Sequence, residues 1–589
     1  MFTIFQQDQK QNQFHKPSLC RKNLKEQSTI KLELKREGRQ KILTVLRKKD
    51  REDLLERKRR NLGIGKIPSL QDNVKINSII ITTNKINSSS FPSSSSSSSL
   101  NYESSEQIIK ILNHYASYVR SADIDSKLKI AHHVRVLLCR EDRPPIKEII
   151  ITGFIPILLD FLQIADSPQL QNEAGWALTN FTAGATSKQI KPLLEKKSVD
   201  LLLYLVSSSH TDPELLDNLI WCIGNLVADP ANEARDVFLK YNGLQIMVDL
   251  YQPEQQTLQI LRHLGWIFTS FVRSPLPSFP RLSCLSKLLP TILYYTNDVE
   301  ILSETFETLH LLCNGDDSEE FIRIQAVLDL NISTLIIQKG LMNKNLKVLK
   351  PALRLCGSLV SGLNSQIQTL LDSGMIDFFY NLLRDQCKEV RFLTCFIMSN
   401  IVSGTSDQLQ MVINKNFISG IVHLANNDTH DIQKEAMWVL IKAVSNANVV
   451  QLQNLIKENS IPALVNALGF QDIEVLQELL SVLGNLINKI PEALDLIEEI
   501  NGIEMIEALK NHKNDSVYDA AIDLIKQIDA IQSNNEENEE IKSFQFKINS
   551  NLNQYQNEIK NNEENNQMES TENQQQKQNS IQKPFVFTF

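Results

Sequence analysis

A short phrase recurs along the middle of this 589-residue chain, and it limits the possible folds more strongly than any other feature. Each copy opens with Gly or a polar turn residue and continues with the apolar spacing of an amphipathic helix. The copies are TGFIPILLDFL from Thr152, NGLQIMVDL from Asn242, SGMIDFFYNLL from Ser373, NSIPALVNAL from Asn459 and NGIEMIEAL from Asn501. A second phrase follows at a fixed distance. It places Trp176, Trp221 and Trp266 45 residues apart, and Trp438 42 residues after Phe396.

This spacing predicts a solenoid. Periods of about 40 to 47 residues are typical of armadillo and HEAT repeats, whose units must stack because none can bury its apolar face alone. The apolar fraction of 42%, with only 19 Gly and 19 Pro, suits a helix-rich body, and no long run alternates as a strand would. We therefore expect an all-α fold, with armadillo repeats over residues 105–530 in about ten units and a concave surface that carries function.

Composition predicts three further segments outside the repeats. Residues 15–62 form a basic arm, and residues 21–60 hold 16 Lys or Arg against 7 Asp or Glu, so this stretch carries +9 and the rest of the chain −17. Residues 63–104 read as a flexible linker with a serine run, and residues 531–589 as a disordered acidic tail rich in Asn and Gln. Only the repeats can bury a core.

The chain shows no pattern of an enzyme, a metal site or a membrane protein. Its eight cysteines form no CxxC pair and no His stands at metal-ligand spacing, so we expect no disulfide framework, metal or cofactor. The GIGK at Gly63 lacks the upstream glycine of a phosphate loop, and no nucleophile elbow occurs. The most apolar stretch, Ile149 to Leu162, is too short to span a bilayer and contains Asp160.

Two Trp/Asn pairs are the candidate binding residues. Trp176 and Asn180, like Trp221 and Asn225, are four residues apart, which places each pair on one helix face. The alternative is that each Trp is a core residue. We favour an exposed ladder, because burying a recurring amide would require several hydrogen bonds each time. Asn amides can then bond an extended peptide, and indole faces can hold Lys or Arg stems. Asp229 could pair with a lysine or could cap a helix end.

The order of these phrases resembles the importin α family. VRVLLCREDRPPIKEII, LQNEAGWALTNFTAG, IWCIGNLVAD, IQKEAMWVL and IEEINGIEMIEALKNHKNDSVYDAA are similar to successive repeats of that family, over roughly residues 20 to 550. The resemblance implies a right-handed superhelical solenoid that binds basic nuclear localization signals. By resemblance, a major site would be lined by Trp176, Asn180, Trp221, Asn225, Asp229, Trp266 and Ser270, where Ser270 stands at a family Asn and Asn314 at a later acid.

The resemblance also implies a minor peptide site, which departs further from the family. Its residues would be Arg354, Phe396, Asn400, Glu435 and Trp438, with Phe396 in place of Trp. Lys442 and Ser358 stand where the family has Asn, and a lysine there would repel a basic ligand. We expect a working major site and a weakened minor site, which favours monopartite over bipartite cargo.

The basic arm reads as a charged helix interrupted by Gly38. By composition it could be a solvated helix, or bind nucleic acid, a membrane surface or an acidic protein, and its seven interspersed acids disfavour nucleic acid and membrane. Before such repeats it resembles the importin-β-binding (IBB) domain, and Arg57, Lys58, Arg59 and Arg60 resemble a cargo signal that would be autoinhibitory.

The resemblance thus implies a nuclear import adaptor that shuttles between cytoplasm and nucleus. Its partners would be importin β, cargo and, through the acidic tail, the export receptor of the family. The alternative is a non-transport armadillo scaffold protein, which would need no segment that mimics its own ligand.

Overall fold

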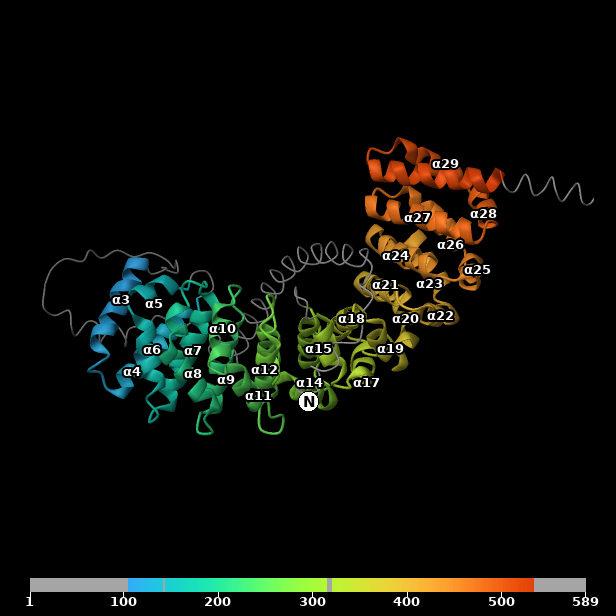
Figure 1. Ribbon diagram of the computed structural model, residues 1–589. Coiled ribbons are helices and arrows are strands. Elements are labelled where there is room, and N and C mark those ends of the chain that lie inside the picture. The colour runs from blue at the N-terminus through green and yellow to red at the C-terminus, as the bar shows by residue number, and fades with distance from the viewer. Residues whose placement is uncertain (1–103, 141–143, 315–319, 534–589) are drawn as a thin grey trace, which may run out of the picture. The chain divides into compact units, whose positions relative to one another are not determined.

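The computed structural model describes residues 104–140, 144–314 and 320–533 (Figure 1). The chain divides into two compact units, residues 1–101 and 102–589, and every described residue belongs to the second unit. The predicted arm, nearly all of the linker and nearly all of the tail lie outside the described residues. The boundaries of these segments, and the residues Arg57 to Arg60, therefore stay predictions.

The described residues form helices and no strands, which confirms the all-α prediction. Most units contain two shorter helical segments followed by a long third helix. The long third helices are α4 (Ile124–Leu138), α7 (Pro168–Gly184), α9 (Pro213–Val227), α12 (Leu258–Phe271), α15 (Val299–Cys313), α18 (Leu346–Leu359), α21 (Lys388–Val402), α24 (His430–Asn446) and α27 (Ile473–Lys489).

The shorter segments come in pairs, a first and a second segment in each unit. The first segments are α5 (Ile146–Ile151), η2 (Lys191–Leu194), α10 (Glu233–Lys240), α13 (Phe279–Leu282), α16 (Glu320–Leu328), α19 (Asn364–Asp372), α22 (Ser406–Asn414), α25 (Val449–Lys457) and α28 (Ala493–Glu499). The second segments are α3 (Ser105–Tyr118), α6 (Phe154–Leu162), α8 (Lys196–Ser207), α11 (Gly243–Leu250), α14 (Leu285–Tyr295), α17 (Ser333–Leu335) with η3 (Ile336–Leu341), η4 (Met375–Phe378) with α20 (Phe379–Leu382), α23 (Ile418–Asn427), α26 (Ser460–Asn466) with η5 (Ala467–Gly469), and α29 (Gly502–Ala508) with η6 (Leu509–Asn511).

The recurring phrase found in the sequence marks the turn between the first and second segments. Its first or second residue has a left-handed backbone, at Gly153, Asn242, Gly374, Asn459 and Asn501, with φ between 57° and 85°. Glycine and asparagine adopt this conformation at least cost, which is why they recur at this point. The apolar residues that follow enter the core, so the predicted turn and amphipathic helix are confirmed.

Each long third helix packs against the long helix of the next unit, from α4 through α7, α9, α12, α15, α18, α21 and α24 to α27. The core is therefore continuous along the described part of the chain. Several of its largest fully buried side chains, among them Phe181, Phe268 and Phe306, come from these helices, and others, such as Phe154 and Phe238, come from the shorter segments. None of the helices in the described ranges combines the length and the apolar character needed to cross a bilayer.

A ladder of buried glutamines joins the later first segments. Gln366, Gln408 and Gln451 are at most 3% exposed. The amide oxygen of each accepts the N–H of its own helix N-cap, at 2.9, 3.0 and 3.1 Å. The amide nitrogen of each donates to a backbone carbonyl of the preceding unit, at 3.0, 2.8 and 2.9 Å. These side chains therefore cap one helix and fix its position on the previous one.

Candidate functional site

The candidate site is built on α7, α9 and α12, three long helices that pack in succession (Figure 1). We call the side chains Trp176, Asn180, Trp221, Asn225, Trp266 and Ser270 the first ladder. Asp212 sets the start of α9, because its carboxylate accepts the N–H groups of Glu214 and Leu215 at 3.0 and 3.3 Å. The same carboxylate accepts a 3.1 Å hydrogen bond from Asn172 of α7, which aligns the two helices.

The expected exposure is wrong for four of the six side chains of the first ladder, whereas Asn225 and Trp266 are half-buried. Trp176 and Trp221 are 7% and 5% exposed, Asn180 is 5% exposed, and Ser270 has no exposed surface. Part of the cover comes from side chains of neighbouring units. The guanidinium carbon of Arg135 lies 4.1 Å from the centroid of the Trp176 ring. The His263 ring lies 5.1 Å from the Trp221 ring at 35°.

Acidic side chains hold both covering groups in place. The Arg135 Nε lies 2.5 Å from Glu173 on α7, and His263 Nδ1 lies 3.1 Å from Asp217 on α9. Burial of the Glu173 carboxylate raises its pKa, but hydrogen bonding with His132 and the charge of Arg135 outweigh this effect, so that the pKa lies below its usual value. Glu173 is therefore an ionised partner of Arg135 at neutral pH.

The ladder amides are hydrogen-bonded within the fold. Asn180 Nδ2 donates to Cys139 Sγ at 2.9 Å. Asn225 Nδ2 donates to the Thr179 carbonyl at 3.3 Å and to Thr182 Oγ1 at 3.2 Å. The amides that we expected to bond a ligand thus also join neighbouring units. Each has a partner for its amide nitrogen within the fold.

Asp229 lies beyond the end of α9 and is also held by the fold. Its Oδ1 accepts a 2.8 Å hydrogen bond from Ser187, and its Oδ2 accepts the Ala231 N–H at 3.1 Å. The guanidinium of Arg273 reaches back to the same helix end, where it donates to the carbonyls of Val227 and Ala228, both at 2.8 Å. The carboxylate is therefore fixed in position as a helix-end acid.

Trp266 and Ser270 differ from the first two pairs. The Trp266 ring packs over Gly224, where a Cβ would lie only 2.5 Å from its Cζ3, so only glycine fits beneath it. The Trp266 indole N–H is buried without a hydrogen-bond partner. The Ser270 hydroxyl donates to the Trp266 carbonyl at 2.9 Å and points into its own helix. The contact of Ser270 with a ligand stays a prediction, and the orientation of its hydroxyl does not favour that contact.

The second ladder, Phe396, Asn400, Trp438 and Lys442, lies on α21 and α24. Phe396 packs over Gly357, as Trp266 packs over Gly224. Asn400 Nδ2 donates to the Phe396 carbonyl at 3.1 Å. Trp438 is 7% exposed, and Lys442 Nζ lies 5.3 Å from the centroid of its ring. The same Nζ lies 3.6 Å from the Glu478 carboxylate of α27.

Arg354 belongs to an ion-pair network next to this ladder. Its guanidinium lies 2.8 Å from Glu307 and 3.1 Å from Glu389, and Lys350 lies 2.9 Å from Glu389. Glu435 is half-buried on α24. The structure thus joins Arg354 to acids of the two neighbouring units.

At Ser358, where the resemblance predicts a ladder Asn, the preceding unit supplies polar groups. His310 Nδ1 lies 2.7 Å from Ser358 Oγ. Asn314 Nδ2 donates to Ser358 Oγ and to the His310 carbonyl, both at 2.9 Å. Asn314 is therefore part of a buried polar cluster between α15 and α18.

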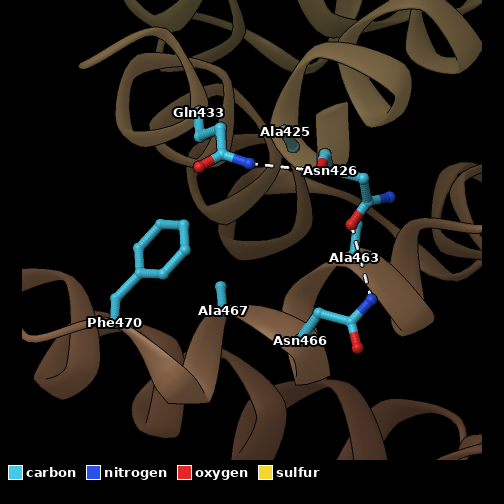
Figure 2. A pocket seen from close by; sticks show the side chains of 7 residues that line it. All are labelled: Ala425, Asn426, Gln433, Ala463, Asn466, Ala467 and Phe470. Carbon is cyan, nitrogen blue, oxygen red and sulfur yellow. Dashed lines mark hydrogen bonds between the residues drawn. The ribbon is translucent and has the colours of Figure 1, made fainter. Parts of the chain in front are cut away.

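A cavity of about 350 Å³ lies away from both ladders (Figure 2). Its lining is neutral: Ala425, Asn426, Gln433, Ala463, Asn466, Ala467 and Phe470. Figure 2 shows Gln433 bonded to the Asn426 carbonyl and Asn466 bonded to the Asn426 side chain, at 3.1 and 3.4 Å. Because no titratable or nucleophilic side chain lines it, the cavity offers no catalytic group.

Analysis of the sequence missed the side chains that cover the indoles. Arg135 and His263 come from helices of neighbouring units, roughly 40 residues away from the indoles that they cover.

Comparison with known proteins identifies the fold and the family. Residues 142–183 match the armadillo/beta-catenin-like repeat, and residues 492–541 match the atypical Arm repeat. An engineered protein of known structure superposes with a TM-score of 0.62 at 20% identity, covering 71% of this chain and 98% of its own. This likeness supports the solenoid fold alone.

The curated relatives extend over most of the chain. Importin subunit alpha-1b of Oryza sativa subsp. japonica is 30% identical over 426 residues, which is 69% of this chain and 77% of the relative. Importin subunit alpha-3 of Arabidopsis thaliana is 29% identical over 449 residues, or 72% and 82% of the two chains. Probable importin subunit alpha-A of Dictyostelium discoideum is 26% identical over 446 residues, or 71% and 80%. Together with the matched repeats, these similarities place the chain in the importin α family.

Proposed function

We propose that this chain is a nuclear import adaptor that binds a lysine-rich import signal on the first ladder. The observation that carries the proposal is the pair of intact Trp/Asn steps, Trp176 with Asn180 and Trp221 with Asn225, on two helices that pack side by side. Asp229 adds a fixed carboxylate at the end of the second step. Indoles, amides and an acid together suit an extended basic peptide.

In this proposal the basic arm at residues 15–62 binds importin β. Arg57, Lys58, Arg59 and Arg60 compete with cargo for the first ladder, because a tethered ligand acts at high effective concentration. Importin β withdraws the arm, so cargo and importin β bind with positive coupling. The adaptor shuttles between cytoplasm and nucleus and returns with the export receptor of the family. It has no enzymatic activity of its own.

The second ladder supports a preference for monopartite signals. Trp438 carries Lys442 over its ring, and Phe396 replaces an indole. A second cluster of basic residues therefore meets a like charge and a weaker aromatic partner. A specific observation also favours the alternative function, a non-transport armadillo scaffold protein: the low exposure of Trp176 and Trp221 limits the surface offered to a peptide.

The test is a fluorescence anisotropy titration of a labelled lysine-rich monopartite peptide. Residues 71–589 contain the whole second unit and are compared with the full chain, with and without importin β. We expect tight binding to residues 71–589, weak binding to the full chain, and recovery when importin β is added. Equal affinity for both forms would refute the autoinhibition.

Matched variants locate the binding site on residues 71–589. Trp221→Phe should weaken peptide binding, because phenylalanine offers a smaller π face. Trp438→Phe is the control, since Trp438 is equally buried but lies outside the first ladder. Absence of binding to residues 71–589, or equal losses in both variants, would favour the scaffold function.

A further inference from the structure

Three of the four tryptophans carry a basic side chain of the chain itself. Arg135 lies over Trp176, His263 stacks on Trp221, and Lys442 lies over Trp438. Each basic group is also next to an acid, as described above for Glu173, Asp217 and Glu478. An indole face with a nearby carboxylate is the environment that a ligand lysine would need. The chain has therefore filled these environments from within.

Lys442 is the clearest case, because its position coincides with that of a ladder amide. It follows Trp438 by four residues on α24, as Asn180 follows Trp176 and Asn225 follows Trp221. Its side chain is 18% exposed, and its ammonium group lies between the indole, at 5.3 Å, and Glu478, at 3.6 Å. A ligand lysine approaching Trp438 would have to displace this group and leave it without its partners.

We propose that Lys442 is a built-in substitute for a ligand lysine, which closes the second ladder to basic peptides while leaving its binding frame intact. This inference rests on the proposed function and deepens it, because it names one residue that determines which ligands the second ladder accepts. The frame consists of the aromatic–Asn step Phe396 with Asn400 and of Trp438 on the next helix. The step at Trp438 lacks its amide, and Phe396 offers a smaller aromatic face than an indole.

Lys442 is the cation over the Trp438 ring, so we expect its substitution to open this face. Lys442→Asn removes the ammonium group, uncovers the face of Trp438 and restores the spacing of indole and amide found at Trp176 and Asn180. Lys442→Arg keeps a cation at the same place and should leave the ladder closed. In this proposal the second ladder binds basic peptides only when residue 442, one helical turn after Trp438, carries a neutral amide.

Lys434 provides a matched control on the same helix. It pairs with Asp472 of α27, so Lys434→Asn also removes a lysine that joins α24 to α27. Its pairing does not involve an indole face among the described cation–ring contacts. Both substitutions therefore change the net charge equally, and only one should change binding at Trp438.

The experiment is isothermal titration calorimetry of residues 71–589 with the lysine-rich peptide, compared for the parent chain and the three variants. We expect one bound peptide per chain for the parent, Lys442→Arg and Lys434→Asn, and a second bound peptide for Lys442→Asn. The new site should bind roughly tenfold more tightly than any residual binding there in the parent, which corresponds to one cation–π contact.

The outcomes separate this inference from the proposed function. An unchanged stoichiometry and affinity in Lys442→Asn, with peptide still bound at the first ladder, would overturn the role of Lys442 alone. A parent chain without binding and a Lys442→Asn variant that binds one peptide would support the inference and refute the proposed first-ladder site. If Lys434→Asn opened a site equally well, net charge rather than the Trp438 face would be the cause, and the inference would fail.

Discussion

Replacing Gly224 with alanine should disturb the first ladder through a steric clash between two units. A Cβ at this position would lie 2.5 Å from Cζ3 and 3.0 Å from Cε3 of Trp266, and 3.2 Å from Cγ1 of Ile267. The indole and α12 would have to shift to accommodate the added Cβ, and the close-packed core around them resists this shift. The expected result is a displaced Trp266 and a loosened contact between α9 and α12.

The magnitude follows from two opposing contributions. Alanine in place of a helical glycine stabilises a helix by about 1 kcal/mol. Overpacking of this kind costs about 1 to 3 kcal/mol. The net effect of Gly224→Ala is therefore a loss of about 0 to 2 kcal/mol.

Gly265 on α12 is a matched control. The nearest atom to a Cβ built there is the Glu304 Cβ at 3.6 Å, which is an ordinary van der Waals contact. Gly265→Ala should keep the helix gain of up to about 1 kcal/mol without a clash. The two variants should thus differ in local stability by about 1 to 3 kcal/mol, in favour of Gly265→Ala.

Hydrogen exchange of the amides in α9 and α12 is the suitable assay, because a repeat array need not unfold as one cooperative unit. The protection of these helices should be about 5-fold to 150-fold lower in Gly224→Ala than in Gly265→Ala. Under the proposed function, Gly224→Ala should also weaken binding of the lysine-rich peptide, whereas Gly265→Ala should not. Equal protection in the two variants would show that the Trp266 contact is not as tight as its geometry indicates.

Two further predictions test the glutamine ladder and the buried thiols. Gln408→Ala removes the side chain that bonds the Thr405 N–H and the Asn364 carbonyl. The amides of α22 should therefore lose about 1 to 3 kcal/mol of protection against hydrogen exchange, while the substitution Gln386→Ala at an exposed position should change their protection little. Equal effects of the two substitutions would contradict the role of the glutamine ladder. Burial raises the pKa of the Cys222 and Cys356 thiols to about 12, so they stay neutral in the folded chain where unfolded thiols ionise near pH 8.5. The contribution of these buried thiols to stability is complete below about pH 8.5 and is lost as the pH rises toward 12. Iodoacetamide at about pH 9 should therefore label Cys222 and Cys356 only when urea unfolds the chain. Rapid labelling without urea would contradict this prediction.

The fold was predictable because its signals are local. The residues with left-handed backbone, such as Asn242 and Asn459, are recognisable as turn residues from their type and from the apolar pattern that follows. The 45-residue spacing of Trp176, Trp221 and Trp266 reports the length of one unit directly. Each of these features depends only on residues within one unit, so a single sequence contains enough information.

The covering of the ladder was not predictable, because it depends on how neighbouring units are offset. Whether Arg135 reaches the Trp176 ring is decided by the packing of α4 on α7, to which many residues contribute. We expected exposure because a buried amide needs several hydrogen bonds. In the structure the buried Asn180 amide donates to the Cys139 thiol, and the half-buried Asn225 amide donates to Thr182.

At the three positions where a ladder Asn was expected but another residue stands, the side chain makes contacts within the chain. At Ser270 the hydroxyl bonds the Trp266 carbonyl, and at Ser358 the side chains of His310 and Asn314 fill the place of an amide. At Lys442 the side chain covers the indole and approaches Glu478. Unpaired polar groups and open space are both costly in a packed interior. Ser358 and Lys442 avoid them through contacts with neighbouring units, whereas the Ser270 hydroxyl bonds within its own helix. Under the proposed function, the two intact Trp/Asn steps on α7 and α9 are the part of the ladder that binds the peptide.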